Sequence, residues 1–233
     1  MHETIYTIPL TESLEQDTEC PFCYLENKLE EEQIGYALGP AMMEPDHRIL
    51  SNKLGYCRVH TQKMAEAKQA LPFALVMDTR MDTVIAALEQ AQTEKSASSR
   101  FFKKAKKANN AQTAMENLTS TCLVCDKIQH TMSKFLYTFW YLYKKEPDFR
   151  ARIEKSHGFC LPHFQAVLSA AKEQAGVKDA FIDALFTLEI ANLKRNKQDV
   201  TNFIKQFDYR SAKQEGTFPK NAHHICGGKL AKF

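Results

Sequence analysis

The chain has 233 residues, of which 44% are hydrophobic and 25% are charged, and it contains only 8 Gly and 8 Pro. This composition supports a buried core in one large or two small domains, and it argues against disorder of the whole chain and against a loop-rich all-β fold. The net charge of +3 is close to neutral, which argues against an evenly basic nucleic-acid-binding protein.

No stretch of the sequence has the roughly eighteen consecutive apolar residues that a membrane helix needs. Residues 1–4 do not open a basic region followed by an apolar one, so we expect no secretory signal. The expected location is therefore cytoplasmic, with no membrane partner. Because thiols stay reduced there, the 7 cysteines are expected to be metal ligands or redox groups rather than disulfides.

Helices are predicted along most of the chain, and no stretch alternates in the manner of a strand. In the first half, the predicted helices cover residues 26–38, 57–70 and 72–88. Residues 93–113 are rich in Ser, Ala, Asn and Lys, which is typical of a solvated linker or an exposed helix. In the second half, the predicted helices cover residues 125–143, a short segment opened by Pro147, 160–175 and 177–210. The tail, 211–233, is polar and has room for one short helix around Ala222.

Six of the seven cysteines form motifs that occur twice in the same order. Each half carries Cys-x-x-Cys followed by Gly-aromatic-Cys-x-x-His, with 33 or 34 residues between its second and third cysteines. The offset between the halves is 102 residues from Cys20 to Cys122 and 103 from Cys57 to Cys160. Such a constant offset is the signature of an internal repeat. The eight motif residues are Cys20, Cys23, Cys57, His60, Cys122, Cys125, Cys160 and His163.

The ligand types in these motifs suit zinc. Three thiolates and one imidazole form a tetrahedral set, and a Cys-x-x-His in the first turn of a helix places both side chains on one face. Thiolates at that position are also favoured by the positive end of the helix dipole. We therefore expect two zinc ions per chain.

Other uses of these cysteines are less well matched. Reduced core cysteines would not explain two complete sets, and a thioredoxin-type dithiol follows a strand, which is not predicted here. A catalytic zinc needs an open coordination position, whereas four protein ligands close the site. An iron–sulfur cluster held by three thiolates and one imidazole remains the alternative.

The pairing of the motifs is not fixed by their spacing. Closure within one repeat needs a loop of about 34 residues, and crossed closure needs about 137, which costs roughly 1.2 kcal/mol more in loop entropy. A duplicated unit must also have been viable before duplication. We therefore expect local pairing, with Cys20 and Cys23 joined to Cys57 and His60, and the remaining four residues around the second ion.

Residues 95–107 carry six cations and no acid, so a basic segment stands out from a mildly acidic remainder. Arg100, Lys103, Lys104, Lys106 and Lys107 flank two phenylalanines, a mixture that binds phosphates and stacks on bases, although a solvated linker is the simpler interpretation. His223, His224 and Cys226 offer the ligand types of a third metal site, but adjacency in a polar tail does not by itself indicate one.

The pattern Cys-Pro-x-Cys, a helical stretch and Gly-aromatic-Cys-x-x-His resembles a bacterial family catalogued as a domain of unknown function. Phe207-Asp208-Tyr209-Arg210 is similar to the C-terminal motif of that family, and the resemblance covers most of residues 15–210. It implies duplicated helical units with metal ligands at the eight motif residues, and it implies no activity.

The sequence thus predicts an all-α fold of two tandem repeats, each held by a Cys3His site and packed as a pseudo-two-fold bundle. The expected divisions are a first repeat, 1–93, a basic linker, 94–113, a second repeat, 114–210, and the tail, 211–233. Because no nucleophile triad, phosphate loop or His-Glu-x-x-His motif is present, we expect a non-enzymatic scaffold that binds a protein or nucleic acid. The alternative is a metalloenzyme or a redox or metal sensor using an iron–sulfur cluster or an exchangeable metal.

Overall fold

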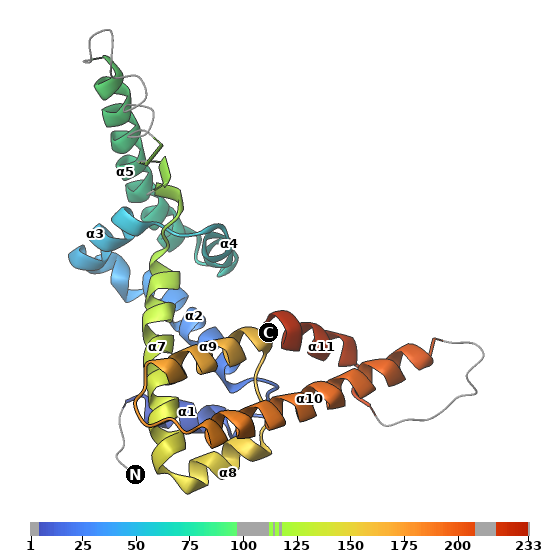
Figure 1. Cartoon of the computed structure of the whole chain (residues 1–233). Helices are drawn as coiled ribbons and strands as arrows, with labels where there is room; N and C mark the ends of the chain where they lie inside the picture. Colours follow the sequence, from blue (N-terminus) through green and yellow to red (C-terminus); the bar gives the residue numbers. More distant parts are fainter. Residues whose placement is uncertain (1–4, 97–111, 114, 117, 208–217, 233) are drawn as a thin grey trace, which may run out of the picture. The chain divides into compact units, whose positions relative to one another are not determined.

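The structure is a computed structural model that describes residues 5–96, 112–113, 115–116, 118–207 and 218–232 (Figure 1). Over these residues it contains ten α-helices, one short 3-10 helix and no β-strand, so the predicted all-α class is confirmed. Within the same residues, no helix combines the length and apolar character that crossing a bilayer requires.

The helices follow the predicted order closely. Those before the basic segment are α1 (Thr7–Ser13), α2 (Pro21–Ala37), η1 (Pro40–Met43), α3 (Pro45–Leu54), α4 (Arg58–Glu66) and α5 (Ala70–Ser96). Those after it are α7 (Leu123–Lys145), α8 (Pro147–Lys155), α9 (Leu161–Lys172), α10 (Asp179–Lys205) and α11 (Ala222–Ala231). Three elements of the first half were not predicted from the sequence: α1, η1 and α3. Helix α3 begins at a proline and is followed directly by a glycine.

Prolines and glycines define the helix ends for simple backbone reasons. Pro45 and Pro147 occupy the first turns of α3 and α8, where a missing N–H loses no hydrogen bond. Gly55 and Gly158 follow α3 and α8 closely with φ of 65° and 72°, a left-handed conformation that favours glycine. These two glycines turn the chain into the Cys-x-x-His motifs.

The chain divides into two compact units that do not coincide with the expected tandem repeats. Unit 1 comprises Met1–Lys28 and Thr131–Phe233, and unit 2 comprises Leu29–His130. The divisions fall within α2 and α7, whereas the sequence had suggested divisions near residues 93 and 114. Unit 1 therefore combines the start of the first half with most of the second.

Unit 1 has an aromatic core. Phe139 is fully buried and contacts Phe22, Trp140, Tyr143, Phe149 and Phe159, with ring centroids 5.4 to 5.9 Å apart. The Trp140 indole N–H donates to the carbonyl oxygen of Val167 at 2.8 Å, so its one polar atom is satisfied. Helices α10 and α11 lie side by side in this unit (Figure 1, orange and red).

Unit 2 has a smaller aliphatic core. Ala37, Leu38, Met64 and Val76 are buried there, and they come from α2, the segment after it, α4 and α5. The long helix α5 also packs against α3. Together these helices surround the Cys-x-x-His motif at the start of α4.

Candidate metal centres

The eight motif residues converge on two groups, each with three cysteines and one histidine. Site 1 consists of Cys20, Cys23, Cys160 and His163, and site 2 consists of Cys57, His60, Cys122 and Cys125. In each group the ligand atoms all lie within 4.8 Å of one another. Site 1 belongs entirely to unit 1 and site 2 entirely to unit 2.

The expected local pairing is wrong, because each group joins the Cys-x-x-Cys of one half to the Cys-x-x-His of the other. The entropic advantage of local closure was only about 1.2 kcal/mol. Phe22, between Cys20 and Cys23, is fully buried with its ring 5.8 Å from those of Phe159 and His163. Burying one phenylalanine contributes about 1.5–3 kcal/mol, so this single contact outweighs the loop term.

Each ligand pair lies at the start of a helix. The carbonyl oxygens of Cys20, Cys57, Cys122 and Cys160 accept hydrogen bonds from the backbone N–H four residues later, at 2.8 to 3.3 Å. The second ligand of every pair therefore lies in the first turn, on the same face as the first. Each group consequently receives two helix N-termini, whose positive ends favour thiolate ligands.

In site 1 the histidine Nδ1 atom faces the three sulfur atoms. It lies 3.5 Å from Cys20 Sγ, 3.3 Å from Cys23 Sγ and 3.2 Å from Cys160 Sγ. The sulfur atoms of Cys23 and Cys160 are 3.5 Å apart. The other ring nitrogen, Nε2, lies on the opposite side of the ring from the sulfurs, so Nδ1 is the candidate ligand atom.

Site 2 repeats this geometry. His60 Nδ1 lies 3.2 Å from Cys57 Sγ, 3.2 Å from Cys122 Sγ and 3.3 Å from Cys125 Sγ, and the sulfurs of Cys57 and Cys125 are 3.9 Å apart. Zinc–sulfur and zinc–nitrogen bonds of ordinary length, in a tetrahedron, place neighbouring ligand atoms about 3.5–3.8 Å apart. The observed separations differ from these values by a few tenths of an ångström, so small side-chain shifts would accommodate a single tetrahedral ion.

Both histidines place their second ring nitrogen beside a carboxylate oxygen of a glutamate on α2. His163 Nε2 lies 3.3 Å from Glu26 Oε2, and His60 Nε2 lies 3.0 Å from Glu30 Oε1. A carboxylate on the far side of a metal-binding imidazole fixes its orientation and makes it a stronger ligand. Neither glutamate was predicted from the sequence. Their spacing of one helical turn, directly after Cys-x-x-Cys, was the available signal.

A lysine in turn pairs with each glutamate. Lys63, one turn after His60 on α4, contacts Glu30. Lys232, after α11, lies 2.6 Å from both carboxylate oxygens of Glu26. Burial alone would raise the pKa of Glu26, but the hydrogen bonds from His163 and Lys232 hold this pKa below its ordinary value. In both sites the cysteines thus face a histidine, the histidine faces a glutamate, and the glutamate pairs with a lysine. The lysine comes from α4 in site 2 and from the residue after α11 in site 1.

Helix α11 also braces the backbone of site 1 through Lys229, which is 1% exposed. Its Nζ donates to the carbonyl oxygens of Glu19 at 2.6 Å, of Phe159 at 3.2 Å and of His157. Glu19 and Phe159 each precede a ligand cysteine directly. In site 2 the corresponding link is a backbone hydrogen bond from Leu123 N–H to the Gly55 carbonyl oxygen at 2.9 Å.

Each Gly-aromatic dipeptide needs glycine for two reasons: its φ is positive, and a neighbouring side chain leaves no room for a Cβ atom. A Cβ on Gly55 would lie 2.8 Å from the Arg80 guanidinium, and one on Gly158 would lie 2.6 Å from Glu189 Oε2. Arg80 donates to the Leu118 carbonyl oxygen at 2.9 Å, and Glu189 accepts the Phe159 N–H at 2.9 Å. The long helices α5 and α10 therefore each support one ligand loop through a charged side chain.

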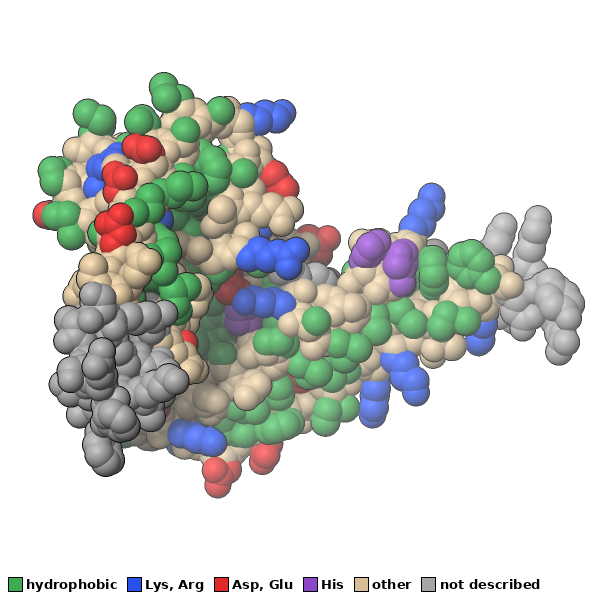
Figure 2. Space-filling view, turned by 90° about the horizontal axis from the view of Figure 1, so that it is seen from above, with side chains coloured by type: hydrophobic (Ala, Val, Ile, Leu, Met, Phe, Trp, Pro, Cys, Tyr) green, Lys and Arg blue, Asp and Glu red, His purple; other side chains and the backbone are tan. Residues whose placement is uncertain are grey.

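The remaining sequence hypotheses concern residues away from the two groups. The basic segment with Arg100 to Lys107, like residues 208–210 of the C-terminal motif, lies outside the described residues. His223 and His224 of α11 are exposed, and Figure 2 shows histidine side chains, in purple, at the surface. His223 stacks on Phe203 with ring centroids 4.8 Å apart, and across the described chain only sites 1 and 2 gather three or more ligands.

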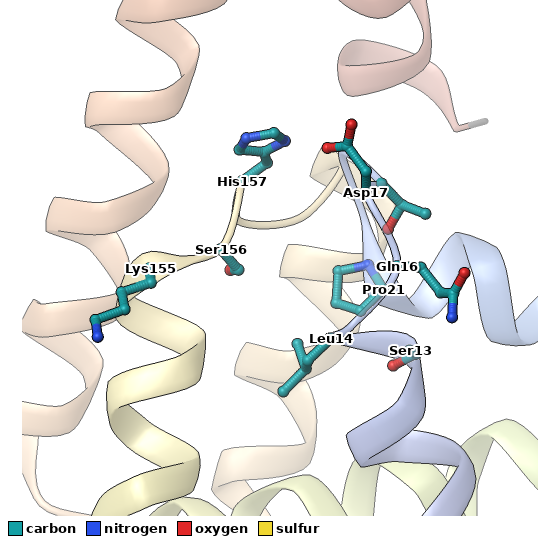
Figure 3. A pocket seen from close by; sticks show the side chains of 9 residues that line it. Ser13, Leu14, Gln16, Asp17, Pro21, Lys155, Ser156 and His157 are labelled. Carbon is teal, nitrogen blue, oxygen red and sulfur yellow. The ribbon is translucent and has the colours of Figure 1, made fainter.

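A small cavity of about 150 Å³ lies beside site 1 in unit 1 (Figure 3). Its two serine hydroxyls, of Ser13 and Ser156, each donate at 2.7 Å to a carbonyl oxygen three residues earlier. Figure 3 shows the side chains of Lys155 and Gln16 pointing in opposite directions. Both serine hydroxyls are therefore occupied by backbone acceptors, and the cavity is a crevice beside the loops that lead to Cys20 and Cys160.

Comparison with known proteins identifies the family of this chain but no curated relative and no solved structure. Neither the curated proteins nor the solved structures include a significant match to this chain. One family model matches residues 1–232, nearly the whole length, which agrees with the resemblance carried by the cysteine motifs. The chain belongs to DUF6062, a family of unknown function.

Proposed function

We propose that this protein is a non-enzymatic helical scaffold held by two structural zinc ions, one at site 1 and one at site 2. The observation that supports it best is the repeated arrangement of three thiols around His Nδ1, with a glutamate on Nε2. When bound, zinc supplies a fixed tetrahedral link between two helix starts. This chain's own residues orient the imidazoles through Glu26 and Glu30.

The spacing of the ligand atoms favours one ion per site over an iron–sulfur cluster. In a multi-iron cluster the four ligands are divided between two or more iron atoms, so ligands of different irons are held apart by the cluster. Sulfur atoms 3.5 and 3.9 Å apart are spaced for a shared ion instead. Four protein donors per ion also favour a structural role over a catalytic one, which needs an open position.

Elemental analysis together with a visible spectrum of anaerobically purified protein tests this proposal. We expect two zinc ions per chain and a colourless solution, because zinc has a filled d shell. A brown protein containing iron and labile sulfide would instead support the cluster alternative. Absence of any bound transition metal, in protein never exposed to a chelator, would overturn metal binding altogether.

The scaffold is further proposed to bind a nucleic acid through its basic segment, residues 95–107. The support for this is the sequence alone: six cations interleaved with two phenylalanines on a chain that is otherwise slightly acidic. Binding to a labelled oligonucleotide should weaken steeply with salt, and replacing Lys103, Lys104, Lys106 and Lys107 by Gln should flatten that dependence. If the four substitutions leave binding unchanged, the partner is to be sought among proteins.

A further inference from the structure

The two sites have the same ligand types but differ in exposure. In site 1 all four ligands are buried. In site 2 His60 and Cys122 are buried, but Cys125 is exposed and Cys57 is half-buried. The open side of site 2 therefore consists of two sulfur-bearing residues whose Sγ atoms are 3.9 Å apart.

The neighbours of each site explain this difference. Site 1 is closed by Phe22 and Phe159, both fully buried, and by Lys229 of α11. In site 2 the aromatic residue before the ligand cysteine is Tyr56, which is only partly buried, whereas Phe159 at the same place in site 1 is fully buried. Unit 2 thus leaves one side of its thiol group open to small solutes.

We propose that Cys125 and Cys57 of site 2 are a modification site for a hydroperoxide oxidant, and that their oxidation releases the metal of site 2 while site 1 stays loaded. This inference rests on the proposed function, because it requires both sites to hold zinc. It adds a division of roles: site 1 is a permanent structural centre, and site 2 is a centre that responds to oxidants.

The chemistry requires only the two sulfurs and the oxidant. The Cys125 thiolate attacks one peroxide oxygen, so an S–O bond forms, the O–O bond breaks and hydroxide leaves when the oxidant is hydrogen peroxide. The Cys57 thiolate then attacks the Cys125 sulfur, forming a disulfide and expelling a second hydroxide. The two sulfurs lose two electrons, which the peroxide gains. Only His60 and Cys122 then remain as donors, too few to retain the ion.

Access, rather than proximity, makes site 2 the preferred target. A disulfide needs sulfurs about 2.05 Å apart, so Cys57 and Cys125 must approach by about 2 Å. In site 1 the sulfurs of Cys23 and Cys160 are already 3.5 Å apart, so distance alone would favour site 1. Oxidation of thiolates follows their exposure, however, and the site 1 sulfurs are buried.

The test uses the full-length chain with Cys226→Ser, which removes the one cysteine outside both sites. The zinc content is measured first. The protein is then treated with hydrogen peroxide, zinc release is followed with a chromogenic chelator, and disulfides are mapped by peptide mass spectrometry. We expect one zinc per chain to leave about tenfold faster than the other, together with a Cys57–Cys125 disulfide, since exposure sets the rate.

The outcomes separate this inference from the proposed function. If the untreated protein holds no zinc, the proposed function fails and this inference fails with it. If it holds two ions that leave at equal rates, or if a Cys23–Cys160 disulfide forms first, the proposed function stands and the inference is overturned. Alkylation of the zinc-loaded protein provides a second measurement: Cys125 should react first, and earlier reaction of any site 1 cysteine would also overturn it.

Discussion

At the residue scale, the two sites depend on side chains that are not ligands. Glu26 and Glu30 hold the histidine rings, and Gly55 and Gly158 allow the turns that deliver Cys57 and Cys160. These residues set the orientation of the donors before any ion is bound. Loss of one of them should therefore change metal affinity without removing a ligand.

Glu26→Ala and Glu30→Ala should each weaken zinc at one site by about 10–100-fold, because the imidazole loses the carboxylate that orients it. The effect is measured by competition with a chelator of known affinity, site by site. Glu31→Ala is the matched control, since Glu31 is exposed on the same helix. Equal zinc affinities for all three variants would show that the carboxylates do not strengthen the histidine ligands.

Glu189 is a second residue-scale case, because it is 2% exposed and burial raises its pKa. Its Oε2 accepts the Phe159 N–H, while Oε1 has no hydrogen-bond partner among the described residues. Glu189→Gln keeps an acceptor and removes a buried charge, so thermal stability at neutral pH should be unchanged or higher. Glu189→Ala should cost about 1–3 kcal/mol, because it leaves the Phe159 N–H unsatisfied. A Gln variant that melts as low as the Ala variant would contradict this assignment.

At the element scale, site 1 is built from three separate segments of unit 1. The start of α2 provides Cys20 and Cys23, the start of α9 follows Cys160, and α11 braces the loops through Lys229 and Lys232. Helix α11 also packs on α9 and α10. Docking of the C-terminal helix and closure of the metal site are therefore expected to support each other.

Lys229→Met should lower the free energy of unfolding by about 3 kcal/mol, since three carbonyl oxygens lose their charged donor and the Glu19 carboxylate keeps only Arg195 as a close cation. Chelator-driven zinc loss from site 1 should also become faster, while loss from site 2 stays the same. Thermal denaturation and the two release rates give the measurement. Lys220→Met, at an exposed lysine just before α11, controls for the loss of charge. A variant that alters both release rates equally would point to general destabilisation instead.

At the scale of the whole molecule, the crossed pairing interlocks the two halves of the sequence. An ion in site 1 would join residues 137 positions apart in the sequence, Cys23 and Cys160. An ion in site 2 would join residues 68 positions apart, Cys57 and Cys125. The two units consequently carry one complete ligand set each. The sites can thus be emptied one at a time by choosing substitutions within one unit.

Two double variants distinguish crossed from local pairing in the full chain. Cys20→Ser with Cys160→Ser removes two ligands of site 1 and should leave one tightly held zinc per chain. Cys20→Ser with Cys57→Ser carries the same chemical change but removes one ligand from each site, so both ions should be held weakly. Native mass spectrometry after brief chelator treatment counts the ions retained. The reverse result, with one ion kept only by the second variant, would restore local pairing.

The sequence by itself determined the helical class, most helix positions and the eight candidate ligands, because these follow from local properties. Helix ends depend on nearby proline and glycine, and a Cys-x-x-His at a helix start fixes two donors whatever surrounds them. Only the tertiary structure decided which motifs meet, since burial of Phe22 against Phe159 and His163 exceeds the small entropic preference for local closure. The outer glutamates and the unequal exposure of Cys23 and Cys125 likewise depend on packing between distant segments, which motif spacing does not contain.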